Sequence, residues 1–174
     1  MAELVPVRNT TDPNRRGDVV FVHGLNGNPR QYWFPPGEPD KFWPAWRGED
    51  LPDVGVWSLG YENAALRPRG FSLTPRFLQA GFAMPLVDRA DDVLLRLGLE
   101  GIGERPLVCI SHSMGGLLIK QVLRTANDST TAKRKALAEW TQGVCFYCHP
   151  AYRFRSREVG PLLQLSAAHE RLRG

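Results

Sequence analysis

The stretch from residue 107 to residue 123, LVCISHSMGGLLIKQVL, limits the fold of this chain more than any other. Its apolar periodicity predicts a buried strand, a sharp turn centred on Ser113, and a helix. Strand and helix can pass closely only if the residues two positions either side of the turn residue are small, and these are Ser111 and Gly115, followed by Gly116. The layout is typical of a nucleophile elbow, which projects a serine hydroxyl above the carboxyl edge of a sheet. A glycine-rich turn without chemistry is the alternative left open.

A second apolar run, VVFVHG at residues 19–24, also ends at a glycine and is followed by turn-forming residues. Two short buried strands far apart in the sequence imply a parallel sheet. In hydrolases with a nucleophile elbow, the loop after such a strand supplies one oxyanion-hole N–H, and the residue after the nucleophile supplies the other. Here these donors are the backbone N–H groups of Leu25, which follows Gly24, and of Met114.

Two histidines lie beside these turns. His23 is predicted to be a packed or loop-orienting histidine rather than a catalytic base. His112 adjoins Ser113, but alternation along a strand places neighbouring side chains on opposite sides, so we expect it to point to the other side of the turn. Neither histidine is therefore predicted to be the base.

The remaining patterns alternate strands with helices and predict a doubly wound α/β fold with a mostly parallel sheet. Further strands are expected at 54–59 and 144–147. Helices are expected from 86 to about 98, from the Ser113 turn to about 126, and from 131 to about 140.

Three segments lack a clear period. Residues 1–17 are predicted to be an irregular tail. Residues 31–52 hold many prolines and aromatic residues and are expected to form a loop over the sheet edge, either as one wall of an acyl pocket or as a cover for the core. Residues 62–85 contain Pro68, Pro75 and Pro85, which break any long helix, so a substrate-side excursion is expected.

These motifs together resemble one family. FVHGLNG at 21–27, FWPAWRGEDLP at 42–52, WSLGYE at 57–62 and SHSMGGLLIKQ at 111–121 are similar to the serine active site-containing protein 1 type of α/β-hydrolase, a lipase-like group. The resemblance covers residues 18–147, so we expect an N-terminal α/β-hydrolase portion there, followed by an atypical basic tail at 148–174. It implies a serine hydrolase that acts on an ester, for which a lipid acyl ester is the favoured candidate, with Ser113 as nucleophile.

The charge and the apolar content of the sequence limit which binding partners and which cellular location we expect. Residues 148–174 hold five arginines and two glutamates, which give +3 of the formal net charge of +4 and leave the rest nearly neutral. We therefore expect no nucleic-acid partner. The sequence has no transmembrane run of 18 apolar residues and no signal-peptide core, which favours the cytoplasm. Peripheral contact with an intracellular membrane, mitochondrial or of the endoplasmic reticulum, is left open; the oligomeric state is not predicted.

The three cysteines do not make an even disulfide framework. Cys109 and Cys145 lie in apolar runs and are expected to be small buried residues. Cys145, Cys148 and His149 form a Cys-x-x-Cys-His pattern, which can mark haem attachment or half of a zinc site. No export signal and no second Cys/His pair accompany it, so we expect no cofactor and no metal, and keep a haem or metal protein as a remote alternative.

The chain departs from the family after residue 147. The family continues with Thr-Pro-His-x-Gly-Ser, and its triad acid and base follow on later loops. Permitted codons for residues 148–159, read one base later, spell Ala-Thr-Pro-His-Ile-Gly-Ser and onward. We therefore hypothesise a one-base frameshift near codon 148; a divergent or spliced tail is the alternative. His149 and His169 are not assigned as the base. A catalytically inactive truncated remnant or binding module is the competing function.

Overall fold

A computed structural model describes residues 1–61 and 85–147 of the chain. The described residues form five strands, β1 (Glu3–Arg8), β2 (Gly17–Val22), β3 (Val54–Gly60), β4 (Leu107–His112) and β5 (Thr141–Tyr147). The helices are the short 3₁₀ helix η1 (Pro39–Lys41) and the α-helices α1 (Trp43–Asp50), α2 (Leu86–Leu99), α3 (Met114–Asn127) and α4 (Ala132–Trp140). The tail at 148–174 and the proline-rich segment expected at 62–85 lie outside the described residues, except for Pro85.

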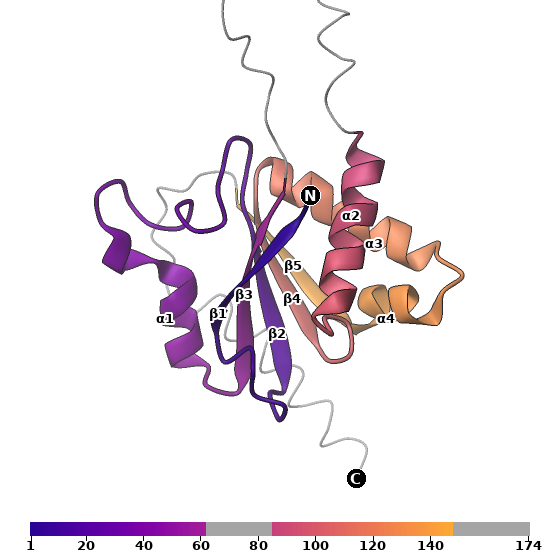
Figure 1. The fold of residues 1–174 in the computed structure, drawn as a ribbon, viewed down its shortest axis with the longest axis horizontal. Helices are drawn as coiled ribbons and strands as arrows, with labels where there is room; N and C mark the ends of the chain where they lie inside the picture. Colours follow the sequence, from indigo (N-terminus) through magenta and orange to yellow (C-terminus); the bar gives the residue numbers. More distant parts are fainter. Residues whose placement is uncertain (62–84, 148–174) are drawn as a thin grey trace, which may run out of the picture.

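The strands form one sheet in the order β1-β3-β2-β4-β5. Strands β3, β2, β4 and β5 are parallel, and β1 pairs antiparallel with β3 at one edge. Helix α1 lies on one side of the sheet and α2, α3 and α4 lie on the other (Figure 1). The predicted doubly wound, mostly parallel α/β architecture is confirmed, as are the helices expected after residues 86, 113 and 131.

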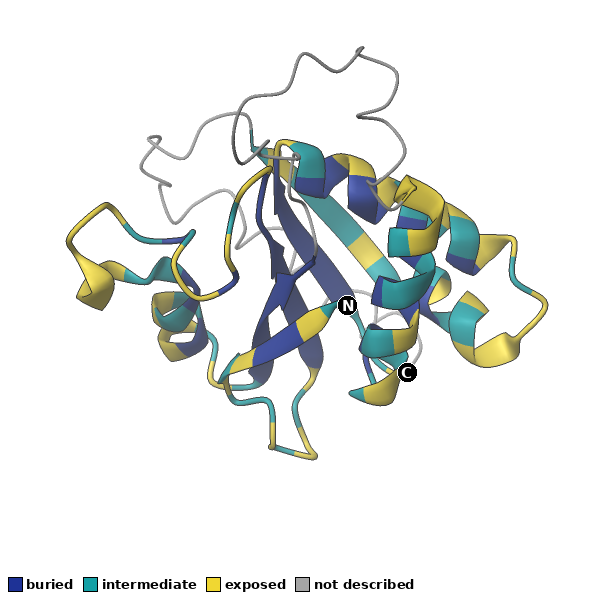
Figure 2. Ribbon diagram, turned by 45° about the horizontal axis from the view of Figure 1, so that its top comes forward, coloured by how far each residue is buried: buried dark blue, intermediate teal, exposed yellow. Residues whose placement is uncertain are grey.

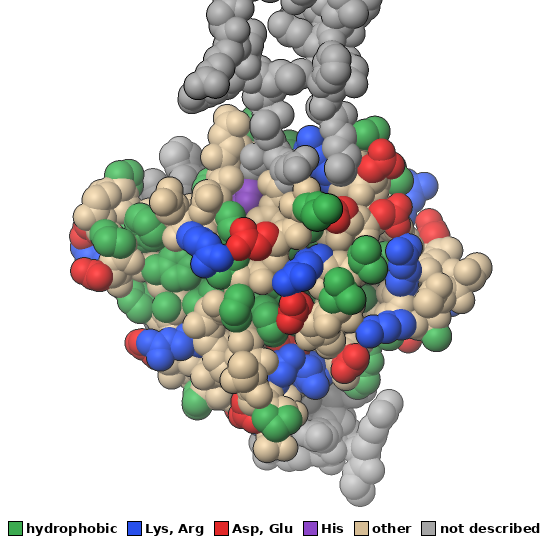
Figure 3. Space-filling view, viewed as in Figure 1, with side chains coloured by type: hydrophobic (Ala, Val, Ile, Leu, Met, Phe, Trp, Pro, Cys, Tyr) green, Lys and Arg blue, Asp and Glu red, His purple; other side chains and the backbone are tan. Residues whose placement is uncertain are grey.

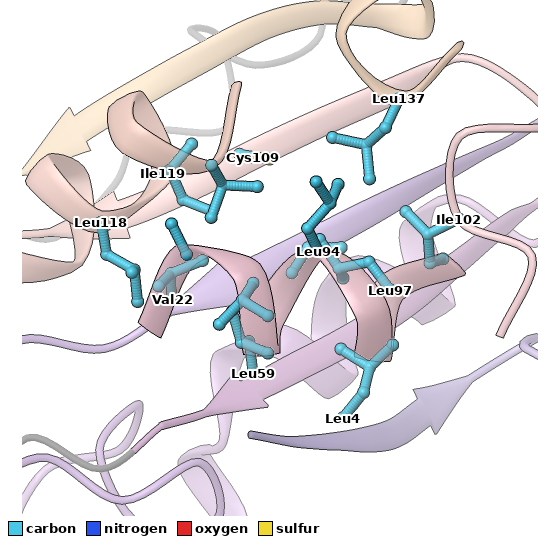
Figure 4. Packing of buried hydrophobic residues seen from close by; sticks show 14 of the residues in the cluster. Leu4, Val22, Leu59, Leu94, Leu97, Ile102, Cys109, Leu118, Ile119 and Leu137 are labelled. Carbon is cyan, nitrogen blue, oxygen red and sulfur yellow. The ribbon is translucent and has the colours of Figure 1, made fainter. Parts of the chain in front are cut away.

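Both faces of the sheet carry a core. Every residue of β2, β3 and β4 is buried, as expected for parallel strands covered on both sides (Figure 2). Leu94 and Leu97 of α2 and Leu118 of α3 pack over Val22 and Leu59 on one face (Figure 4). On the opposite face, the ring of Phe21 meets Trp43 at 4.8 Å and Trp33 at 5.3 Å between centroids. The central strands therefore cannot shift without disturbing both cores.

Two expectations about the first fifty residues are wrong. The segment predicted to be an irregular tail contains β1, whose Leu4 and Val5 are buried against β3. Pro6 argued against a strand in the sequence, but a proline is tolerated in an edge strand such as β1. The segment 31–52 contains η1 and α1 in place of an uninterrupted loop. Pro44 sits in the first turn of α1, where its missing N–H breaks no hydrogen bond.

Four aromatic residues of the segment 31–52 cover the core, which was one of the two options: Tyr32, Trp33, Phe42 and Trp43. Trp33 is buried, and its ring lies 5.3 Å from that of Trp43 and 5.2 Å from that of Tyr32. Edge-to-face contacts of this kind hold the segment against the outer face of β2.

A buried carboxylate at the amino ends of the strands was not singled out from the sequence. Asp18 accepts hydrogen bonds from the Arg15 Nε–H and the Trp57 Nε1–H, both at 2.8 Å, and Arg105 lies 3.6 Å away. The Arg15 guanidinium also lies 5.8 Å from the centre of the Trp57 ring. This network joins β2, β3 and the segment before β4 at the end of the sheet opposite Ser113.

We expect Asp18→Ala to lower the free energy of unfolding by about 3–5 kcal/mol, because it leaves Arg15 buried without its counter-charge. Urea unfolding followed by circular dichroism measures this change. The matched control is Asp50→Ala, since Asp50 is 62% exposed and pairs with Arg47 at the surface, and such pairs contribute at most about 1 kcal/mol. Equal losses in the two variants would contradict a structural role for the Asp18 network.

Charges on the described surface are mixed in sign. On the face shown in Figure 3, basic and acidic side chains are interspersed. Several form ion pairs, such as Arg30 with Glu3 at 2.7 Å and Arg134 with Asp91 at 3.1 Å. That face therefore offers little uncompensated positive charge, although the expected lack of a nucleic-acid partner stays a prediction.

Candidate functional site

The candidate site lies where the chain path across the sheet reverses. β2 and β4 are parallel neighbours with Val22 opposite Ser111, yet the chain leaves β2 toward α1 on one face and leaves β4 into α3 on the other. Loops that diverge in this way open a crevice at the carboxyl ends of the strands, where α/β sheets commonly bind ligands. The residues after these two strands, His23 to Leu25 and Ser113, lie at this edge of the sheet.

Ser113 occupies an unusual backbone conformation between β4 and α3, with φ 50° and ψ −120°. A residue with a side chain seldom adopts positive φ, and such strain is concentrated at functional sites. Its backbone is held on both sides, because its N–H donates to the Tyr147 carbonyl and its carbonyl accepts from the Gly116 N–H, both at 3.0 Å. The side chain is exposed, and its hydroxyl has no hydrogen-bond partner among the described residues.

The turn depends on small residues. A Cβ atom at Gly115 would lie 2.6 Å from the Val22 carbonyl oxygen and would also collide with that of His23. At Gly116 it would lie 2.6 Å from the Phe146 ring. Ser111 is buried, and its hydroxyl donates to the Cys145 carbonyl at 3.1 Å, so serine fits this position without leaving its hydroxyl unsatisfied.

His23 is a packed histidine, as predicted. Its Nδ1 lies 2.9 Å from the Gly24 carbonyl oxygen, and its ring stacks on that of Tyr61 at 4.6 Å with planes 6° apart. The Tyr61 hydroxyl donates to the His23 carbonyl at 2.9 Å. Burial lowers the pKa of His23, an effect only partly offset by the hydrogen bond to Gly24. The ring is buried, stacked and hydrogen-bonded to the backbone, so its role is structural, and this burial does not suit it to be a base.

Tyr32 is the site residue that sequence reasoning missed. Its hydroxyl forms a hydrogen bond with Nδ1 of His112, which is 8% exposed. The same hydroxyl would lie 2.6 Å from a Cβ atom at Gly24, so the Gly24 backbone packs directly against it. Nothing in the sequence distinguishes Tyr32 from the other aromatic residues of the segment 31–52, since its partner is 80 residues away.

The proposed oxyanion donors follow the two neighbouring strands β2 and β4. Leu25 follows Gly24, and its side chain is 46% exposed. Met114 is the first residue of α3, where backbone N–H groups have no partner within the helix and the helix dipole favours negative charge. A Cβ atom at Gly24 would lie 3.3 Å from the His112 carbonyl oxygen, so the two donor-bearing segments are in contact next to Ser113.

The cysteines of the described segment do not carry reactive thiolates. Cys109 is buried in β4, and burial, with a smaller contribution from Cys145, raises its pKa to about 12. Cys145, also expected to be buried, is only partly buried because it lies on the edge strand β5, and this partial burial raises its pKa as well. Cys148 and His149 of the Cys-x-x-Cys-His pattern lie outside the described residues. Within residues 1–61 and 85–147, no group of three His, Cys, Asp or Glu side chains could hold a metal ion.

Comparison with known proteins gives a consistent set of relatives. The chain is 31% identical over 170 residues to Protein SERAC1 of Homo sapiens, 30% identical to that of Mus musculus and 28% identical to that of Danio rerio. The human alignment covers 89% of this chain but 24% of the relative, so the chain spans about a quarter of the length of these proteins. No family model matches the chain.

Proposed function

We propose that the chain is a portion of an α/β-hydrolase related to Protein SERAC1 and that Ser113 is its nucleophile. One observation carries the proposal: an exposed serine with φ 50° and ψ −120° between a buried strand and a helix. A nucleophile elbow needs this strained turn to present the hydroxyl above the sheet. Ser111, Gly115 and Gly116 supply the small size that the turn requires.

The proposed chemistry is acyl transfer from an ester. Ser113 Oγ attacks the ester carbonyl carbon and gives its proton to a general base, and the carbonyl oxygen becomes an oxyanion. The N–H groups of Leu25 and Met114 are proposed to stabilise that charge. Collapse of the tetrahedral intermediate expels the alcohol, which takes the proton from the base, and water then releases the acid from the serine ester.

An acyl group of apolar character, as in a lipid ester, is the substrate that we propose. Leu25 is 46% exposed beside the site, and Leu117, 58% exposed, lies one helical turn after Ser113 on α3. Exposed leucines next to a reacting group favour an apolar ligand. Among the described residues, no helix is long and apolar enough to cross a membrane. A cytoplasmic location, or a peripheral one on an intracellular membrane, stays a prediction.

A catalytically inactive remnant or binding module is the second candidate, and one observation favours it. Among the described residues, the two histidines, His23 and His112, are buried and bonded to Gly24 and Tyr32, so neither is available as a base for Ser113. In this fold the acid and base follow the nucleophile in the chain. His149 and His169 lie outside the described residues.

Covalent labelling tests the assignment of the nucleophile. We expect a fluorophosphonate to add one phosphonyl group to the chain, above the background of Ser113→Ala, as measured by intact mass and mapped by peptide sequencing. The reason is that oxyanion donors assist attack by the serine even where a base is missing. Ser129→Ala, in the loop before α4, is the matched control and should be labelled like the wild type. Equal labelling of wild type and Ser113→Ala would refute the proposal.

A further inference from the structure

The hydroxyl of Tyr32 lies at the junction of the two loops that form the site. It forms hydrogen bonds with His112, the residue before Ser113, and with the backbone of Gly24, the residue before Leu25. Its ring packs between those of His23, at 5.8 Å, and Trp33, at 5.2 Å. One side chain from the segment after β2 thus joins the β2 loop to the end of β4.

The donors and acceptors along this chain of hydrogen bonds follow from the chemistry of the groups. The Gly24 N–H can only donate, so Tyr32 Oη accepts that bond. The bond between Tyr32 Oη and His112 Nδ1 holds one proton, which the phenol donates when His112 is protonated on Nε2 and the ring donates when His112 is protonated on Nδ1.

The carbonyl of Gly24 is held as well. His23 Nδ1 is 2.9 Å from it and donates, and the Gly27 N–H donates to the same oxygen at 3.1 Å. The Gly24 carbonyl and the Leu25 N–H belong to one planar peptide unit. Fixing the direction of that carbonyl therefore fixes the direction in which the Leu25 N–H points.

We propose that Tyr32 is a positioning residue, whose hydroxyl joins the Gly24 backbone to His112 and so sets the Leu25 N–H relative to Ser113. This inference rests on the function proposed above. Tyr32 touches neither the ester nor the oxyanion in this role; it acts through the peptide groups of Gly24 and through His112. Without the hydroxyl, the Gly24 N–H and His112 Nδ1 lose their shared partner, and the two loops are free to move apart.

Tyr32→Phe tests the role, because it removes the hydroxyl and keeps the ring packing. We expect the first-order rate constant of Ser113 phosphonylation to fall about 10- to 100-fold, since small misplacements of catalytic groups have effects of this size. The concentration that gives half-maximal labelling should stay unchanged, because the hydroxyl does not contact the reagent. A purely structural role would not separate these two constants.

Ser58→Ala is the matched control. The buried Ser58 hydroxyl donates to the Pro29 carbonyl at 2.7 Å and so anchors the same loop at Pro29. We expect Ser58→Ala, like Tyr32→Phe, to lower the midpoint of urea unfolding. Unlike Tyr32→Phe, it should leave the rate constant of Ser113 phosphonylation unchanged. If Tyr32→Phe is labelled as fast as the wild type, or if Ser58→Ala slows labelling equally, the positioning role is overturned.

A second measurement separates failure of this inference from failure of the proposed function. Should Ser113 not be labelled in the wild type, the proposed function is wrong, and amide hydrogen exchange then decides the role of Tyr32. Faster exchange of the Leu25 N–H in Tyr32→Phe than in Ser58→Ala, together with a changed ¹⁵N shift of His112 Nδ1, supports the link. Unchanged exchange and an unchanged nitrogen shift overturn it.

Discussion

Gly115→Ala is expected to lower the free energy of unfolding by about 3 kcal/mol and to abolish phosphonylation of Ser113. The added Cβ would lie 2.6 Å from the oxygen and 3.1 Å from the carbon of the Val22 carbonyl, and would also collide with the His23 carbonyl. These are backbone atoms at the end of β2, which pairs with β3 on one side and β4 on the other. Since β2 cannot move, α3 must, and it carries the Ser113 turn with it.

The other glycines near β5 provide graded controls for this prediction. At Gly116 the added Cβ would meet the ring of Phe146, a half-exposed side chain that can turn away, so Gly116→Ala should destabilise less. At Gly143 no atom lies within 4 Å, and alanine should change stability by less than about 1 kcal/mol. Urea unfolding should therefore rank the losses as Gly115, Gly116, Gly143. Helix propensity alone predicts that alanine stabilises α3, so a gain at Gly115 would contradict the packing argument.

Much of the fold could be predicted because its signals are local. The buried parallel strands are nearly unbroken apolar runs, and the amphipathic period of α2 and α3 is regular. The turn at Ser113 could be predicted because the small residues that it requires, Ser111, Gly115 and Gly116, lie within three positions of it in the sequence. In each case, the residues that determine the structure lie within one or two turns of each other.

What sequence reasoning missed depends on contacts between distant residues. β1 is short and contains Pro6, and pairing with β3, some fifty residues on, is what makes it a strand. α1 has a proline in its first turn and buries Pro44 and Gly48 against the sheet edge, so tertiary packing stabilises it more than propensity does. Tyr32 meets His112 only because β2 and β4 are neighbours.

The 174-residue chain is expected to hydrolyse p-nitrophenyl esters negligibly, whereas the chain read in the +1 frame from codon 148 should hydrolyse them clearly. The proposed oxyanion donors and the exposed Ser113 are on the described part of the chain. Without a base, the serine hydroxyl is a weak nucleophile, and a well-ordered site then keeps a residual rate enhancement of only ~10³ to 10⁴ over water. The +1 frame is predicted to restore Thr-Pro-His-x-Gly-Ser and, beyond it, an Asp and a His.

Two measurements decide this prediction separately. Sequencing the gene around codon 148 tests the frameshift, and an early stop or the lack of the motif in the +1 frame would rule it out. Release of p-nitrophenol by both forms, each with and without Ser113→Ala, tests the chemistry. In the +1 form, activity that survives Ser113→Ala would show that another residue attacks the ester.

If the 174-residue chain itself turns over esters at enzyme-like rates that Ser113→Ala removes, a base lies within it. Because His23 and His112 are buried and bonded to Gly24 and Tyr32, His149 and His169 would then be the histidines to replace.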